Sequence, residues 1–596
     1  MLQRTGGVAP IRPASIVLTG PFAPPLATAR PLQSHQGLPA TLASSAELLD
    51  IRPIALAAPA QQLTAGLVAE PPASAAGSVA SLAGPRFTGP EVLEALPPLP
   101  AEFPPLPELK LPKYSTATLR NGLRVFLLRD EEVPLVRVTL LMRGGQYASP
   151  PDKVGLASLT TYVQRAGGST AHPAASLDGR LEELAASIEL GAGPQAISAD
   201  MACLAEDTEE VMGLMAEVIR SPVLPADKLA IYQAQLLNAL EHQNDNPGSI
   251  ARRKITKLLY GPDSAYARTP TKAAVSAIST DDLRAYAQRW ERPDAAVLGV
   301  VGSFEPRKML QLLEKEFGSW APAPGQPDAP PAVPRSPPPA LPLVVEATSP
   351  AAETAETAGT AGAGTSVVKV AAATASSAAL TPVANASAPH RPVVYLVDRP
   401  GLTQANVLTA EPGITLSDPD VFALDVLGGV FNSFGGQLFD TLRSREGLAY
   451  SVSGSWDSPP DHQGLFLAGG QTSAPGEFLR SLRQLLARAA SDPPSEAELE
   501  AAKAETLNSF AFNFASTSSQ LQRILVYDLL GLPQDYLFRY FRGIEAVGRA
   551  DVAAAAQRHL HAERQAVVVV GDREMAQPSL EAAGFEVLPM RLEDAA

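Results

Sequence analysis

Few residues of this chain have the type and spacing that catalysis needs. The seven histidines form neither H-x-x-x-H nor H-E-x-x-H, and His559 and His561, two positions apart, would not face each other on a helix. The single cysteine, Cys203, lies in an apolar alternating run and is expected to fill a strand face. One polar pair lies in the segment LRSREGLAYSV, where Arg443 and Tyr450 are seven residues apart. A guanidinium can donate to a carbonyl oxygen, and a phenol can donate to a developing oxyanion.

A purely structural interpretation of the same pair is also open. Arg443 could form an ion pair with a nearby acid, Asp440 or Glu446, and Tyr450 could be a half-buried residue that fills a strand face. The spacing alone does not decide between the two interpretations, because arginine and tyrosine are common residues.

The composition excludes several classes of protein. The chain has 596 residues, one cysteine and a net charge of −15. One cysteine excludes an intrachain disulfide framework and a multi-cysteine metal cluster. The negative charge argues against nucleic-acid binding as the main function. Of the 57 prolines, 33 fall in residues 1–113 and 321–390. We therefore expect the first stretch to be a disordered leader and the second to be a disordered linker.

The leader has a further feature. Residues 1–46 contain arginine but no aspartate, glutamate or lysine, a composition typical of an organellar transit peptide. The predicted location is therefore an organelle, with the chloroplast favoured over the mitochondrion and the bacterial periplasm as the alternative. An extension without targeting value is the other interpretation. No run of 18 apolar residues occurs, so we expect no membrane span.

An internal repeat predicts the domain organisation. Residues 282–302 and 551–571 align without a gap and share eight of 21 positions, and each has the pattern of a helix followed by a buried strand. The predicted fold class is α+β. Two homologous halves, residues 114–320 and 391–588, would each form a mostly antiparallel sheet packed with helices, and a short tail, 589–596, would follow.

The two halves resemble the insulinase/pitrilysin family of zinc peptidases, the inverzincins. The segment ATLRNGLRVFLLRDEEVPLVRVTLLMRGGQYASPPDKVGLASL is similar to the start of the family's N-terminal half, and FGGQLFDTLRSREGLAYSVSGSW is similar to its C-terminal half. The resemblance implies a fold like that of mitochondrial processing peptidase. The family's H-x-x-E-H motif supplies two zinc ligands and a general base. Here the matching positions hold Ser158, Thr161 and Tyr162, and the position of the distal glutamate holds Asn238.

The resemblance implies a division of labour. Some members are heterodimers in which one subunit carries H-x-x-E-H and the other keeps an Arg/Tyr pair that contacts the peptide backbone, here Arg443 and Tyr450. We therefore expect a non-catalytic, substrate-binding subunit that is inactive alone and holds no cofactor. Its partners would be a zinc-bearing subunit and a peptide substrate. Two alternatives stay open: a structural protein similar to the core subunits of respiratory complex III, and a peptidase with unrecognised chemistry.

Overall fold

The computed structural model describes residues 112–321 and 392–592, apart from positions 434, 513 and 515. All of these residues belong to one compact unit of the chain, Ser45–Ala596. All but the last two residues of the expected leader, and all but the first residue of the expected linker, lie outside the described residues. The disorder of both stretches and the transit peptide therefore stay predictions. We call residues 112–321 the first half and residues 392–592 the second half.

The first half is built on a six-stranded sheet. Its strand order is β1-β2-β6-β3-β5-β4. Four of the five strand pairings are antiparallel, and β2 with β6 is the parallel one. The strands are β1 (Ser115–Thr118), β2 (Arg124–Arg129), β3 (Leu135–Arg143), β4 (Ser187–Ala192), β5 (Ala196–Leu204) and β6 (Ala296–Gly302).

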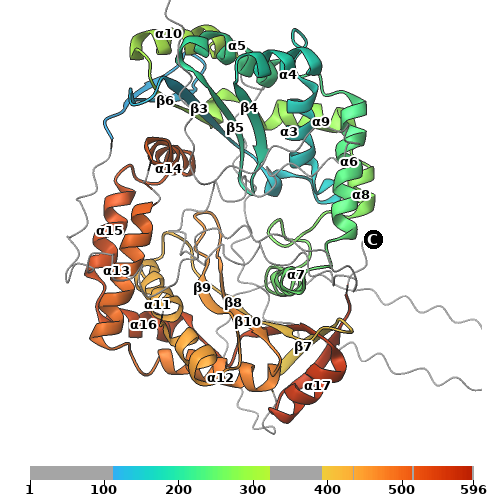
Figure 1. Ribbon diagram of the computed structural model, residues 1–596, viewed down its shortest axis with the longest axis vertical. Coiled ribbons are helices and arrows are strands. Elements are labelled where there is room, and N and C mark those ends of the chain that lie inside the picture. Colours follow the sequence, from blue (N-terminus) through green and yellow to red (C-terminus); the bar gives the residue numbers. More distant parts are fainter. Residues whose placement is uncertain (1–111, 322–391, 434, 513, 515, 593–596) are drawn as a thin grey trace, which may run out of the picture. The chain divides into compact units, whose positions relative to one another are not determined.

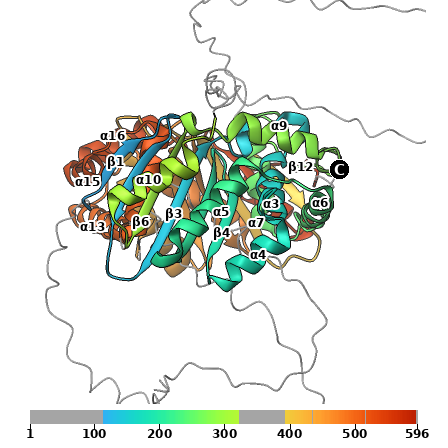
Figure 2. The same ribbon diagram turned by 90° about the horizontal axis from the view of Figure 1, so that it is seen from above.

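Helices cover the first sheet. Figures 1 and 2 show α5 and α10 along one of its faces, and α3 packs against the edge strand β4. The helices of this half are α3 (Leu156–Gly167), α4 (Ala174–Glu183), α5 (Thr208–Arg220), α6 (Ala226–Glu241), α7 (Pro247–Tyr260), α8 (Lys272–Ser276), α9 (Thr280–Trp290) and α10 (Pro306–Phe317). Short 3₁₀ turns are η1 (Gln146–Ala148), η2 (Pro151–Lys153), η3 (Ala205–Asp207) and η4 (Pro293–Ala295).

The second half has a sheet of the same size and nearly the same order, β12-β7-β11-β8-β10-β9. Three of its five pairings are antiparallel. The strands are β7 (Val393–Asp398), β8 (Ala405–Pro412), β9 (Val452–Trp456), β10 (Leu465–Thr472), β11 (Ala566–Gly571) and β12 (Glu586–Met590). Strand β12 thus continues two residues into the segment expected as a tail.

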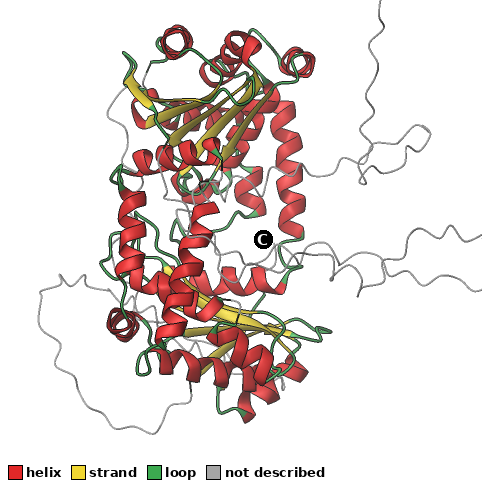
Figure 3. Cartoon of the chain, turned by 60° about the vertical axis from the view of Figure 1, so that its left-hand side comes forward, coloured by secondary structure: helices red, strands yellow, loops and turns green. Residues whose placement is uncertain are grey.

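The helices of the second half again pack around their sheet, and Figure 3 shows the strands of each sheet grouped together and bordered by helices. They are α11 (Val421–Asn432), α12 (Pro475–Ala489), α13 (Glu496–Phe512), α14 (Thr517–Leu530), α15 (Tyr536–Ala546), α16 (Arg549–His559) and α17 (Arg573–Ala582), with a π-helical turn η5 (Phe439–Arg445). The predicted α+β class, with two helix-packed sheets, is confirmed. Within the described residues no helix is long and apolar enough to cross a membrane.

The segments that align in the sequence occupy matching places. Helix α9 leads into β6, α16 leads into β11, and both strands lie third in their sheets. Every residue of β11 is buried, and all of β6 is buried except Gly302, because each of these strands has neighbours on both sides and helices on its faces. Helix α9 begins with a capping box between Ser279 and Asp282, which satisfies free N–H groups of its first turn.

One helix of each half packs against the sheet of the other half. Helix α14 of the second half packs on β6, β3 and β2, and α7 of the first half packs on β11 and β8. The approach of α14 is close, since a Cβ atom at Gly299 of β6 would lie 2.7 Å from Leu525 Cδ1. The sequence pattern did not predict this exchange of helices. The exchange joins the two halves through apolar contacts.

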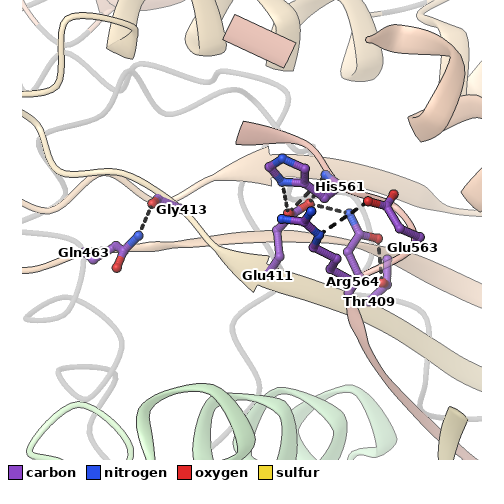
Figure 4. A network of polar contacts seen from close by, with 8 residues as sticks. Thr409, Glu411, Gly413, Gln463, His561, Glu563 and Arg564 are labelled. Atoms are coloured by element: carbon purple, nitrogen blue, oxygen red, sulfur yellow. Dashed lines mark hydrogen bonds and ion pairs between the residues drawn. The ribbon is translucent and has the colours of Figure 1, made fainter. Parts of the chain in front are cut away.

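A buried polar network orders the chain between α16 and β11 (Figure 4). The Glu411 carboxylate on β8, only 3% exposed, accepts hydrogen bonds from the His561 backbone N–H (2.9 Å) and from Gln565 Nε2 (2.7 Å). Thr409 Oγ1 donates to Gln565 Oε1 at 2.8 Å. Since a buried carboxylate needs partners, these contacts fix the path of the chain into β11.

Candidate functional site

The three positions that match H-x-x-E-H lie together on α3. Ser158 and Tyr162 are half-buried, whereas Thr161 is fully buried. The Thr161 hydroxyl donates to the backbone carbonyl of Ser158 at 3.0 Å, within its own helix. The side chain that would act as general base in the family is therefore a hydroxyl committed to the helix backbone.

Tyr162 makes a specific contact with α6. Its ring stacks on that of Tyr232, with centroids 5.5 Å apart and an interplanar angle of 22°. Burial raises the pKa of both phenols, so both stay neutral at neutral pH. The position of the second zinc-binding histidine thus holds half of an aromatic pair between two helices.

Asn238, at the position of the distal glutamate, also lies on α6, but its side chain is exposed. It follows Tyr232 by six residues, which is about 9 Å along a helix axis. Its backbone carbonyl accepts from the His242 N–H at 3.3 Å, where the helix ends.

These four positions do not fit a zinc ion. Structural and catalytic zinc is bound by cysteine, histidine and carboxylate side chains, and none of the four supplies one. The hydroxyl of Thr161 and the ring of Tyr162 already have partners within the helices. No zinc chemistry is therefore assigned to this half of the chain.

One group of three ligand-type side chains occurs elsewhere in the described residues: Asp418, Asp420 and His559, with ligand atoms within 4.8 Å of one another. The Asp420 carboxylate already accepts from Arg558 at 2.6 and 2.7 Å and lies 2.8 Å from His559 Nε2. The Arg558 guanidinium holds the pKa of Asp420 below its usual value. This group is an ion-pair network that joins the start of α11 to the end of α16.

Arg443 and Tyr450 meet in space. The Arg443 guanidinium carbon lies 4.6 Å from the ring centroid of Tyr450 and 4.6 Å from that of Phe439. Such cation–π contacts hold the guanidinium while leaving its N–H groups free to donate in the plane. Tyr450 is 61% exposed, one of few large apolar side chains so exposed in the described part of the chain. The expectation of a half-buried strand residue is thus wrong for Tyr450.

The expected ion pair of Arg443 does not form either. Asp440 pairs instead with Arg445, with Nη2 and Oδ2 2.5 Å apart. Across residues 112–321 and 392–592, with their three gaps, no carboxylate pairs with Arg443. The structure therefore brings Arg443 and Tyr450 together at the surface, as one cationic and aromatic unit. Its role in substrate binding stays a prediction.

Sequence reasoning missed a cluster that links the halves. His462, in the loop between β9 and β10, stacks on Tyr266 of the first half at 3.7 Å and 18°. Tyr147 contacts the His462 ring edge-on at 6.2 Å. Asp461 Oδ1 accepts from Gln195 Nε2 (2.5 Å) and lies 2.8 Å from His462 Nδ1. These residues lie in loops and in the short turn η1, where no periodic sequence pattern predicts contacts.

A second missed feature lies behind Tyr162 on α3. The buried Gln164 donates from Nε2 to Glu291 Oε2 at 2.8 Å. Glu291 is only 7% exposed, and desolvation raises its pKa to about 7, partly offset by this hydrogen bond. The carboxyl is thus about half protonated at pH 7 and largely protonated in acidic solution. Glu291 follows directly after Trp290, the last residue of α9, and nothing in the sequence around it indicated that its side chain would be buried.

Comparisons with known proteins agree with this picture. Residues 277–357 and 373–506 match the domain family described as peptidase M16 inactive domain. The uncharacterised zinc protease YmxG of Bacillus subtilis is 20% identical over 410 residues, which cover 68% of this chain and 86% of that protein.

Solved structures share the fold. A peptidase M16 inactive domain from Pseudomonas fluorescens superposes with a TM-score of 0.60 at 21% identity, covering 77% of this chain and 98% of that one. A protease from Helicobacter pylori gives a TM-score of 0.60 at 17% identity and covers 78% of this chain and 100% of its own. The matches confirm the resemblance to the insulinase family, M16, and the family model that matches this chain is that of its inactive domain.

Proposed function

We propose that this chain is the non-catalytic, substrate-binding subunit of a heterodimeric zinc metallopeptidase of the insulinase type. The zinc and the general base belong to a partner subunit that carries H-x-x-E-H. This chain supplies Arg443 and Tyr450, which contact a peptide or an unfolded segment of a protein.

One observation carries the proposal. The positions for the metal are filled by a helix-bound hydroxyl and a stacked tyrosine, whereas Arg443 and Tyr450 lie together at the surface, with no carboxylate partner among the residues that the structure describes. An arginine held by aromatic rings can donate to a peptide carbonyl without a large loss of side-chain entropy. The match to an inactive M16 domain supports the same division between the two subunits.

Isolation of the chain from its native source tests the proposal. Mass spectrometry of the purified complex should identify a second subunit with H-x-x-E-H, and peptide cleavage should require both subunits. The isolated chain should contain far less than one zinc per molecule by plasma emission spectrometry. Stoichiometric zinc in the chain alone, or cleavage by it, would overturn the proposal. A stable complex without peptidase activity in any combination would favour the structural alternative.

Two further interpretations belong to the proposal. The matching strand orders support an origin of the two halves by duplication of one ancestral half. The composition of residues 1–46 supports import into an organelle, with the chloroplast favoured. Fusion of residues 1–113 to a fluorescent protein tests this import, and secretion of the fusion into a bacterial periplasm would contradict it.

A further inference from the structure

We propose that Arg445 is a positioning residue that keeps Arg443 available for peptide by occupying Asp440. The inference rests on the proposed function only in naming what Arg443 is kept available for. Its basis is the arrangement of charges in and after the turn η5, which holds two arginines and one aspartate and is followed at once by Glu446.

The charges in this turn are divided unequally. Asp440 Oδ2 lies 2.5 Å from Arg445 Nη2, in a pair whose side chains are 36% and 72% exposed. Arg443 instead contacts two aromatic rings, Phe439 and Tyr450. Asp440, the acid within the turn, is thus paired with Arg445, five residues away, and not with Arg443, three residues away.

The π-helical geometry explains this choice. In an α-helix, side chains three or four residues apart are neighbours, so Asp440 would face Arg443. In η5 the turn is wider, as shown by the Glu446 N–H, which donates to the Thr441 carbonyl five residues earlier at 3.0 Å. Residues five apart then lie one turn apart, which brings Arg445 over Asp440. Residues four apart also remain close, which places Arg443 over Phe439.

Removal of Arg445 would leave the Asp440 carboxylate without its cation. Arg443, three residues away, is the other arginine of the turn and would then be drawn to it. A charge-assisted bond to a carboxylate is stronger than one to a neutral carbonyl, so Asp440 would compete with a peptide. Because exposed ion pairs are weak, we expect an effect of about two- to fivefold.

The rate at which phenylglyoxal modifies Arg443 tests the inference without any peptide. This reagent adds to a free guanidino group, and a bound carboxylate slows it. The rate is measured by mass spectrometry of digests of the full-length chain, after circular dichroism has shown that each variant is folded. Arg488→Ala is the matched control, because it removes an arginine from another exposed pair, with Asp492 at 3.7 Å.

Arg445→Ala should slow modification of Arg443 about two- to fivefold. Arg445→Lys, which keeps the cation, and the double variant Asp440→Asn/Arg445→Ala, which removes the competing acid, should both react as the wild type does. An unchanged rate in Arg445→Ala, or an equally slow rate in the double variant, would overturn the inference. Because no peptide takes part, failure of the proposed function would show separately, as peptide cleavage that survives the loss of Arg443.

Discussion

Tyr162 of α3 stacks on Tyr232 of α6, with ring centroids 5.5 Å apart, at the place where the family's zinc peptidases hold a metal ligand. The position that matches a zinc ligand therefore holds a ring that packs between these two helices. An aromatic pair now joins α3 to α6, and both phenols are only half-buried. The region can stay folded without a metal ion.

A double-mutant cycle on this pair tests its contribution. Tyr162→Ala and Tyr232→Ala should each lower the free energy of unfolding by about 1–3 kcal/mol, since each removes a half-buried ring. The coupling between them should be about 0.5–1.5 kcal/mol, the size measured for aromatic pairs. Urea denaturation monitored by circular dichroism gives these values. Tyr162→Phe is the control and should change stability little, and strictly additive losses would show that the rings do not interact.

Glu291 should make the stability of the first half depend on pH. Its pKa is about 7 in the folded chain, against 4.5 for an unperturbed glutamate, because the carboxyl is buried. The folded state therefore holds this proton more tightly than the unfolded state does. The resulting stabilisation is complete below about pH 4.5 and is lost as the pH rises through 7, by about 3 kcal/mol in total.

Glu291→Gln should remove that part of the pH dependence, because the amide cannot ionise. Urea denaturation between pH 5 and 8 measures the difference between the variant and the wild type. Glu545→Gln, at an exposed position of α15, is the matched control and should keep the wild-type slope. An identical slope in Glu291→Gln would mean that this carboxyl does not titrate with folding.

The stack of His462 on Tyr266 should help to hold the two halves together, because its members come from opposite halves. His462→Ala should broaden the distribution of distances between spin labels on Glu182→Cys and Glu477→Cys, measured by double electron–electron resonance. Both label positions are exposed, on α4 and α12. His242→Ala is the control, since His242 pairs with Asp245 at 2.8 Å within the first half. An unchanged distribution in His462→Ala would show that this stack does not help to hold the halves together.

Much of the fold followed from local patterns. The aligned segments 282–302 and 551–571 predicted a helix and a buried strand, and the structure has α9 with β6 and α16 with β11. The exchange of α7 and α14 could not be predicted in this way. Apolar residues such as Leu521 and Leu525, four apart, indicate that one face of a helix is buried. They do not indicate which of two similar sheets will cover that face.

The site followed from the sequence only in part. The resemblance to the insulinase family pointed to Arg443 and Tyr450, and the structure brings them into contact. The structural interpretation offered Asp440 or Glu446 as a partner for Arg443, but the π-helical turn gives Asp440 to Arg445 instead. The stack of His462 on Tyr266 joins loops nearly 200 residues apart, and Glu291 is buried only by tertiary packing. Neither leaves a periodic signal in the sequence.

The most direct test of the account is peptide cleavage by the reconstituted complex of this chain with its zinc-bearing partner. The double variant Arg443→Ala/Tyr450→Phe should lower kcat/KM about 10- to 100-fold, because it removes donors to the peptide and to the tetrahedral intermediate. The zinc content of the complex and its stability should not change, and Arg488→Ala should cleave as the wild type does. Wild-type kcat/KM in the double variant would contradict the claim that this subunit binds substrate through Arg443 and Tyr450.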